Sequence, residues 1–149
     1  MTSAARLYTP EMLALAASLA DLPIDLAMPL GGRARSASCG SSLELSLAVD
    51  NQARISRVGM RAQACAVGQA SAALFAAGAV GKTRAEIADA ANALARWLNG
   101  EQDAPDWPGL DTISAAAALP ARRGAIMLAW LAALDALAPL PLPTDENRR

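Results

Sequence analysis

The two cysteines of this chain, Cys39 and Cys65, are the residues whose type and placement could support chemistry. Cys39 precedes a run that alternates apolar and polar residues like a half-buried strand, and Gly40 beside it lets the backbone turn. Cys65 lies where a second strand-like run changes to helix formers, and a helix N-terminus favours a thiolate through its unpaired N–H groups and macrodipole. If the two runs pair as a hairpin, both sulfur atoms come to the same end of the sheet. They would act there as nucleophiles or as soft metal ligands.

The number and spacing of the two cysteines also fit a role without chemistry, since such cysteines are more often small buried hydrophobes. The chain has no histidine, which is the commonest general base and nitrogen ligand, and its carboxylates are scattered over polar faces. The stretch Gly81-Lys82-Thr83 lacks the earlier glycine of a phosphate loop, because that position is Ala76, so a loop before a capped helix is expected. Arg122 and Arg123 indicate a solvated helix start, and contact with an acidic partner is the alternative.

The pattern of apolar residues predicts the elements that position the cysteines. Three strands are expected to form an antiparallel meander, over residues 33–38, 42–49 and 54–62. Helices are expected over residues 10–20, 66–78, 84–98 and 121–138, with a short one capped by Asp111, and loops over residues 29–32 and 101–109. The expected fold class is therefore α+β, with a three-stranded antiparallel sheet covered on one side by helices.

Composition limits the classes of protein to which the chain can belong. Its 149 residues fit a single domain, 1–149, with a proline-rich and charged tail at 140–149 that we expect to be flexible. Thirteen basic and 14 acidic residues give a net charge of −1, so neither nucleic acid nor a membrane surface is an expected partner. We see no signal-peptide pattern and no uninterrupted membrane span, and we expect a soluble, cytoplasmic protein. In that compartment two cysteines are free thiols, metal ligands or redox partners more often than a disulfide.

Several motifs, taken in order, resemble one family. They are Cys39-Gly40-Ser41, the strand pair after it, Ala64-Cys65-Ala66 leading into a small-residue helix, Gly81-Lys82-Thr83-Arg84-Ala85-Glu86, Pro120-Ala121-Arg122-Arg123 and Leu128-Ala129-Trp130. This order and spacing resemble the IscU/NifU N-terminal type of iron–sulfur cluster assembly scaffold over most of the chain. The long segment between Gly100 and Asp111 and the Leu-Ala-Trp ending are most similar to the SufU-like branch. The resemblance implies the same α+β fold.

The resemblance also implies a site and shows where this sequence departs from it. In that family three cysteines and an aspartate meet at one end of the sheet and hold a nascent iron–sulfur cluster or a zinc ion. Cys39 and Cys65 match the first two cysteines, whereas Ser41 stands at the aspartate position and Ala125 at the third cysteine position. Tetrahedral coordination normally takes four donors, so an iron or zinc site here would need donors from outside the chain.

Our leading hypothesis from the sequence is a divergent scaffold or carrier of iron–sulfur cluster assembly, which is not an enzyme. It would bind iron, a nascent cluster or zinc through Cys39 and Cys65. The resemblance implies a cysteine desulfurase as partner, and a homodimer could complete the site. One alternative is a degenerate IscU-like interaction module without metal chemistry. Another is a sulfur-relay protein in which one thiol accepts persulfide sulfur and the two thiols cycle through a disulfide.

Overall fold

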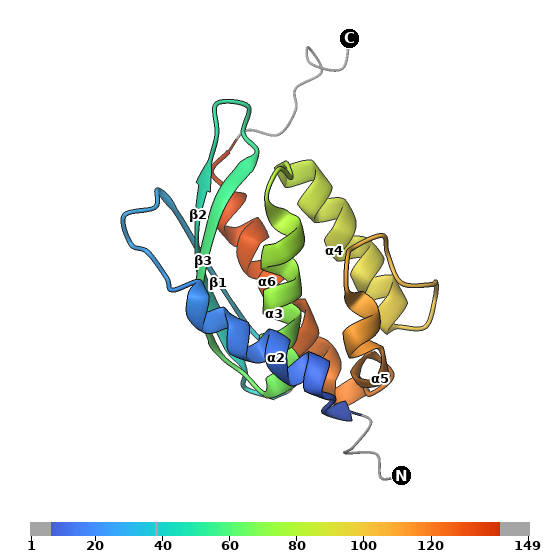
Figure 1. The fold of residues 1–149 in the computed structure, drawn as a ribbon. Helices are drawn as coiled ribbons and strands as arrows, with labels where there is room; N and C mark the ends of the chain where they lie inside the picture. The colour runs from blue at the N-terminus through green and yellow to red at the C-terminus, as the bar shows by residue number, and fades with distance from the viewer. Residues whose placement is uncertain (1–6, 38, 141–149) are drawn as a thin grey trace.

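The computed structural model describes residues 7–37 and 39–140, in which helices and strands follow one another as shown in Figure 1. The expected flexible tail lies outside the described residues, apart from Leu140. The strands are β1 (Leu30–Arg35), β2 (Ser42–Val49) and β3 (Ile55–Gln63). The helices are α2 (Pro10–Ser18), α3 (Ala66–Ala79), α4 (Arg84–Leu98), α5 (Ser114–Ala117) and α6 (Pro120–Leu137), with 3₁₀ turns η1 (Leu19–Asp21) and η2 (Leu110–Ile113).

The sheet is a three-stranded antiparallel meander in the order β1-β2-β3. Leu43, Leu45 and Leu47 of β2 point to the same face, since side chains alternate along a strand, and each is at most 1% exposed. This alternation is the pattern that predicted the strand. The α+β class and the antiparallel sheet are confirmed.

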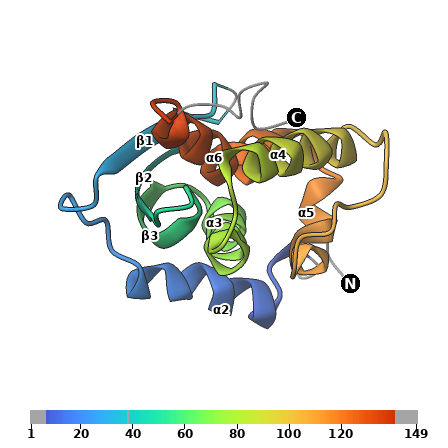
Figure 2. The same ribbon diagram turned by 90° about the horizontal axis from the view of Figure 1, so that it is seen from above.

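Helices α6 and α3 pack against the leucine face of the sheet, and α4 and α2 pack on these two helices. Figure 2 shows α3 in the middle of the molecule, with α2 on one side of it and α6 and α4 on the other. Helix α3 is largely buried and consists mainly of small residues, which lets neighbouring backbones approach closely. Phe75, Trp107 and Trp130 form an aromatic cluster in which ring centroids lie 5.3–5.8 Å apart. This cluster fills the space between α3 and α6.

Part of the opposite face of the sheet is covered by the segment that follows η1. The N–H of Met60 on the outer edge of β3 donates to the carbonyl of Leu22 at 2.8 Å, and the N–H of Asp25 donates to the Ser46 hydroxyl at 3.0 Å. Ser46 is only 3% exposed although it points away from the leucine face. Helices thus cover one side of the sheet, as expected, and a loop covers part of the other.

The first strand spans Leu30–Arg35 and not the expected 33–38, so the expected loop over 29–32 is wrong at residues 30–32. Gly31 and Gly32 are loop signals in the sequence, but Gly32 is the point where β1 lies against α6. A Cβ at Gly32 would clash with the carbonyl oxygen of Ala132 and lie 2.5 Å from the amide nitrogen of Ala136. The Asp135 carboxylate accepts the N–H of Arg33 at 3.0 Å. These contacts with α6 explain why β1 includes Gly31 and Gly32 and begins at Leu30.

The segment between α4 and α6 also differs from expectation. Asp111 does not cap the short helix; it lies inside η2, which begins after Gly109 with φ at +85°. Trp107 lies in the expected loop and is buried there, and its indole N–H donates to the carbonyl of Leu74 at 2.8 Å. The expected capped helix after Gly81-Lys82 is confirmed, because Thr83 and Glu86 form a reciprocal capping box.

Among the described residues, no helix is long and apolar enough to cross a bilayer.

Candidate functional site

A tight loop between β1 and β2 carries Cys39. The N–H of Ser36 donates to the carbonyl of Ser41 at 2.8 Å, and the N–H of Gly40 donates to the carbonyl of Ser36 at 3.0 Å. Gly40 has φ at +73°, a conformation that glycine adopts without strain, and a Cβ there would meet nothing within 4 Å. The loop is therefore closed at its base by two serines and holds the cysteine near its tip.

The strand register brings the segment of Cys65 to the same end of the sheet. Ser42, the first residue of β2, pairs with Gln63, the last residue of β3, and the two cysteines lie just outside this pair. Cys65 is the N-cap residue of α3, although its side chain makes no capping hydrogen bond. Figure 1 shows the first turns of α3 and α6 at this end, opposite the turn that joins β2 to β3.

The Cys39 sulfur is exposed and lies among hydroxyl groups. Its Sγ atom lies 3.3 Å from the Ser36 hydroxyl oxygen and 3.2 Å from that of Ser41. The hydroxyl of Ser36, then that of Ser41, stabilises the thiolate and lowers the pKa of Cys39 from 9.0 to about 7, and the positive charge of Arg122 acts in the same direction. The alternative of a small buried hydrophobe is thus wrong for Cys39. Cys65 is half-buried, and both thiols are free.

Ser41 and Ala125, the two positions where the resemblance implies ligands, lie at this end as well. Ser41 is 8% exposed and its hydroxyl contacts the Cys39 sulfur. Ala125 is 1% exposed in the first half of α6 and faces the first turn of α3, since a Cβ at Gly68 would lie 3.2 Å from the Ala125 Cβ. Gly68 therefore has a packing reason: it lets α3 approach α6 one turn after Cys65.

The donors in the described part of the chain do not complete a tetrahedral metal site. Within residues 7–37 and 39–140, no three His, Cys, Asp or Glu side chains gather closely enough to hold a metal ion. Two thiols and two serine hydroxyls differ from the thiolate and carboxylate sets that bind zinc or iron–sulfur clusters. Such a group would need further donors from outside the chain.

The roles of two residues near the thiol, Ser36 and Arg122, do not follow from the sequence. Ser36 was placed inside the expected first strand, and its role depends on the strand ending at Arg35. Arg122 was assigned to a solvated helix start, but it is half-buried and donates to the Tyr8 hydroxyl at 3.3 Å across 114 residues of sequence. The only local signal was the small polar residues on both sides of Cys39. A contact made across the whole chain leaves no such signal.

We expect that replacing both Ser36 and Ser41 with alanine raises the pKa of Cys39 well above 7. Removing both hydrogen-bond donors leaves the thiolate without its two main sources of stabilisation. The inflection in the pH profile of Cys39 alkylation should move up by more than about one unit. At pH 7 a smaller fraction of Cys39 is then thiolate, so the alkylation rate should fall. The fall should be only about threefold, because each remaining thiolate is more basic and reacts faster.

The matched control is Ser42→Ala, which removes a neighbouring hydroxyl at the start of β2. The pH profile of Cys39 alkylation in this control should keep its inflection near 7. A double variant that titrates like the unaltered chain would show that the two serines do not stabilise the thiolate. Cys65→Ser should be present in every variant, so that a single thiol is followed.

Comparison with known proteins places this geometry in a known fold. No protein-family model matches the chain, and no curated protein sequence shows significant similarity. Among solved structures, an N-terminal NifU-like protein from Brucella abortus aligns with a TM-score of 0.81 at 22% identity, covering 92% of this chain and 96% of that one. A putative iron–sulfur cluster assembly scaffold for the SUF system, SufU from Fervidobacterium islandicum, aligns with a TM-score of 0.75 at 20% identity, covering 88% and 96%. A hypothetical protein aligns with a TM-score of 0.63 at 19% identity, covering 86% and 97%.

These neighbours confirm the fold that the resemblance implied. NifU-like and SufU structures share the arrangement of sheet and helices over nearly the whole described chain. At these identities the likeness shows the fold alone, because one fold supports several functions and the site residues decide among them.

Proposed function

We propose that this chain is an accessory factor of iron–sulfur cluster assembly that carries sulfur on the Cys39 thiol. The observation that carries the proposal is the environment of this thiol, which is exposed in a tight loop with two hydroxyl groups 3.2 and 3.3 Å from the sulfur. A thiolate that accepts hydrogen bonds and remains accessible is suited to attack a sulfur donor. The fold supports the setting, since neighbours of this chain are described as NifU-like and as a cluster assembly scaffold.

The proposed step transfers one sulfur atom without a net change in oxidation state. The Cys39 thiolate attacks the outer sulfur of a persulfide on a cysteine desulfurase, the donor class that the resemblance implies. An S–S bond forms at Cys39 as the donor's S–S bond breaks, and the bonding electron pair leaves with the donor's cysteine as a thiolate. Cys39 then holds the persulfide. The chain carries the sulfur onward and does not act as an enzyme.

The donor set favours sulfur carriage over a complete scaffold. A scaffold has to hold iron and sulfide through several ligands at once, whereas a carrier needs one accessible nucleophile. Here the positions that would supply two further ligands are Ser41 and Ala125. The serine instead contributes a hydrogen bond to the thiol, which helps a nucleophile.

Sulfur counting with single-cysteine variants tests the proposal. After incubation with a cysteine desulfurase and free cysteine, followed by removal of small molecules, the unaltered chain should hold about one cyanide-labile sulfur atom per molecule. Cys39→Ser should hold none, and Cys65→Ser should still be loaded. Equal loading of the Cys39→Ser variant would contradict the proposal. Circular dichroism of each variant shows that the fold is kept.

A second candidate is a shared metal site in which Cys39 and Cys65 supply two of the ligands. The register that brings both cysteine segments to one end of the sheet favours it. The remaining donors would come from a second copy of the chain, a partner's thiol, a small thiol or solvent. Iron or zinc that copurifies anaerobically and is lost in each cysteine variant would support this candidate. Metal-free protein that takes up no sulfur but binds the desulfurase would support the interaction module instead.

A further inference from the structure

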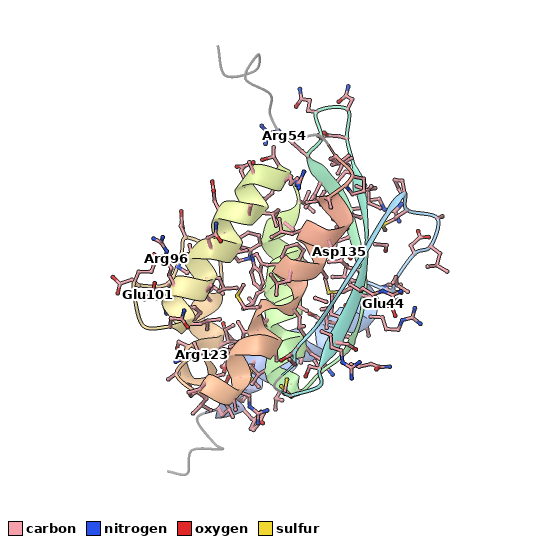
Figure 3. The ribbon with its side chains drawn as sticks, turned by 180° about the vertical axis from the view of Figure 1, so that it is seen from behind. Glu44, Arg54, Arg96, Glu101, Arg123 and Asp135 are labelled. Carbon is pink, nitrogen blue, oxygen red and sulfur yellow. The ribbon has the colours of Figure 1, made fainter. Side chains whose placement is uncertain are left out.

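A surface groove runs between α4 and α6 and ends at the loop that carries Cys39. We call it the α4–α6 groove; its volume is about 410 Å³, and its lining includes Arg35, Ser36, Leu98, Arg123, Met127 and Leu131. Figure 3 shows Arg123 on the face of the molecule that also carries Arg96 and Glu101. Ser36 belongs to both places, because it lines the groove and its hydroxyl lies 3.3 Å from the Cys39 sulfur.

The charges of the groove have one sign. Arg35 and Arg123 are its ionisable lining residues. Across the described parts of the chain, neither makes an ion pair with a carboxylate. The Nε atom of Arg123 is buried and, among the described residues, has no hydrogen-bond partner. A guanidinium without a carboxylate partner at the lining of a groove is suited to a carboxylate brought by another molecule, because a carboxylate fits a guanidinium best.

The floor of the groove is apolar. Leu98 is buried, Met127 is half-buried, and Leu131 is 44% exposed although it belongs to a helix of the core. Arginine, methionine and leucine beside a hollow are the composition of a protein contact more than of a small-anion site. The groove is thus complementary to a segment with an apolar side chain and a carboxylate close to it.

We propose that the α4–α6 groove docks an acidic, partly apolar segment of the protein that delivers sulfur to Cys39. This inference rests on the proposed function and adds the chemistry of the partner's contact. A segment bound to Arg123 and Leu131 leads along the groove to Ser36 and thereby to the thiol. Docking there brings the donor's persulfide to the accessible side of the loop, which raises the effective concentration of the reactants.

Charge reversal along the groove tests the inference with the cysteine desulfurase as the probe. Arg123→Glu and, separately, Arg35→Glu should each weaken desulfurase binding about tenfold or more and slow sulfur uptake from it accordingly. Binding by the unaltered chain should also weaken with salt, and less so in the two variants. Arg35 is exposed, so its variant tests the groove even where Arg123→Glu does not fold.

The matched control is Arg96→Glu, an exposed arginine of α4 outside the groove lining, which should bind the desulfurase within about twofold of the unaltered chain. Loading of Cys39 by glutathione persulfide, which needs no docking, should be equal in all variants. Groove variants that bind and load from the desulfurase as well as the control does would overturn the inference while the sulfur-carrier function stands. A dimer that Arg123→Glu dissociates would also overturn it, since a second copy would then occupy the groove. Failure of both donors to load Cys39 in the unaltered chain would instead reject the proposed function.

Discussion

A chain that carries both Ser41→Asp and Ala125→Cys is expected to bind one zinc ion far more tightly than the natural sequence. The two substitutions supply the aspartate and the third cysteine that the resemblance implies at these positions. Both lie at the end of the sheet where Cys39 and Cys65 lie. Going from two thiolates to three thiolates and a carboxylate should raise zinc affinity by roughly a hundredfold or more.

The tight packing around Ala125 sets the cost of the larger side chain. Ala125 is 1% exposed and lies against Gly68, where α3 and α6 approach so closely that a Cβ on Gly68 would lie 3.2 Å from the Ala125 Cβ. A thiol is a small hydrophobe that is common in protein cores, so the cost of the extra atom is about 1 kcal/mol. The same arrangement directs position 125 toward the first turn of α3, which follows Cys65.

Competition with a chromophoric zinc chelator under anaerobic conditions measures this effect. The control is Ser41→Asp with Ala129→Cys, which places the added thiol one turn further along α6 at another buried position. The control should stay close to the natural affinity. Equal zinc binding by the two double variants would show that position 125 is not part of a latent ligand set. That result would also argue against Ala125 as the position that corresponds to the third cysteine of the family.

Gly32→Val is expected to destabilise the fold by about 3 kcal/mol or more, which is a large part of the stability of an ordinary domain. A Cβ at this position meets the Ala132 carbonyl oxygen and the Ala136 amide nitrogen, which belong to the backbone of α6 and cannot turn aside like a side chain. Either β1 or α6 has to move away. The hydrogen bond from the Arg33 N–H to the Asp135 carboxylate would be lost with that movement.

Urea denaturation followed by circular dichroism measures the change, and Gly31→Val is the matched control. A Cβ at Gly31 would have only the Leu45 carbonyl oxygen within 4 Å, at 3.9 Å, so the control should stay within about 1 kcal/mol of the natural chain. If the two variants unfold at the same urea concentration, the close approach of β1 to α6 is not what Gly32 provides. Loss of sulfur uptake in Gly32→Val but not in Gly31→Val would further connect this contact with the loop that follows β1.

What could be predicted from the sequence depended on local signals. Thr83 and Glu86 indicated α4 because a capping box is made within four consecutive residues. The alternating leucines indicated β2 because a strand with one buried face has a period of two. Cys65 could be placed at the start of α3 because the change in residue types lies beside it.

What could not be predicted depended on contacts between distant parts of the chain. Gly32 looked like a loop residue because the helix that explains it is 102 residues away, as measured by the bond from Arg33 to Asp135. The environment of the thiol has the same origin. Ser36 reaches the sulfur only because β1 ends one residue earlier, and Arg122 is held near it by Tyr8. The sequence pattern thus predicted where the two cysteines lie, whereas the contacts of Ser36 and Arg122 with Cys39 became apparent only in the structure.

Sulfur carriage on Cys39 can be measured directly by peptide mapping with mass spectrometry, on the natural chain after one round of exposure to a persulfide-loaded cysteine desulfurase. We expect that the peptide containing Cys39 gains the mass of one sulfur atom and that prior alkylation of Cys39 prevents the gain. Added sulfur on the peptide containing Cys65 alone, or a chain that gains none while its desulfurase partner stays loaded, would contradict sulfur carriage on Cys39.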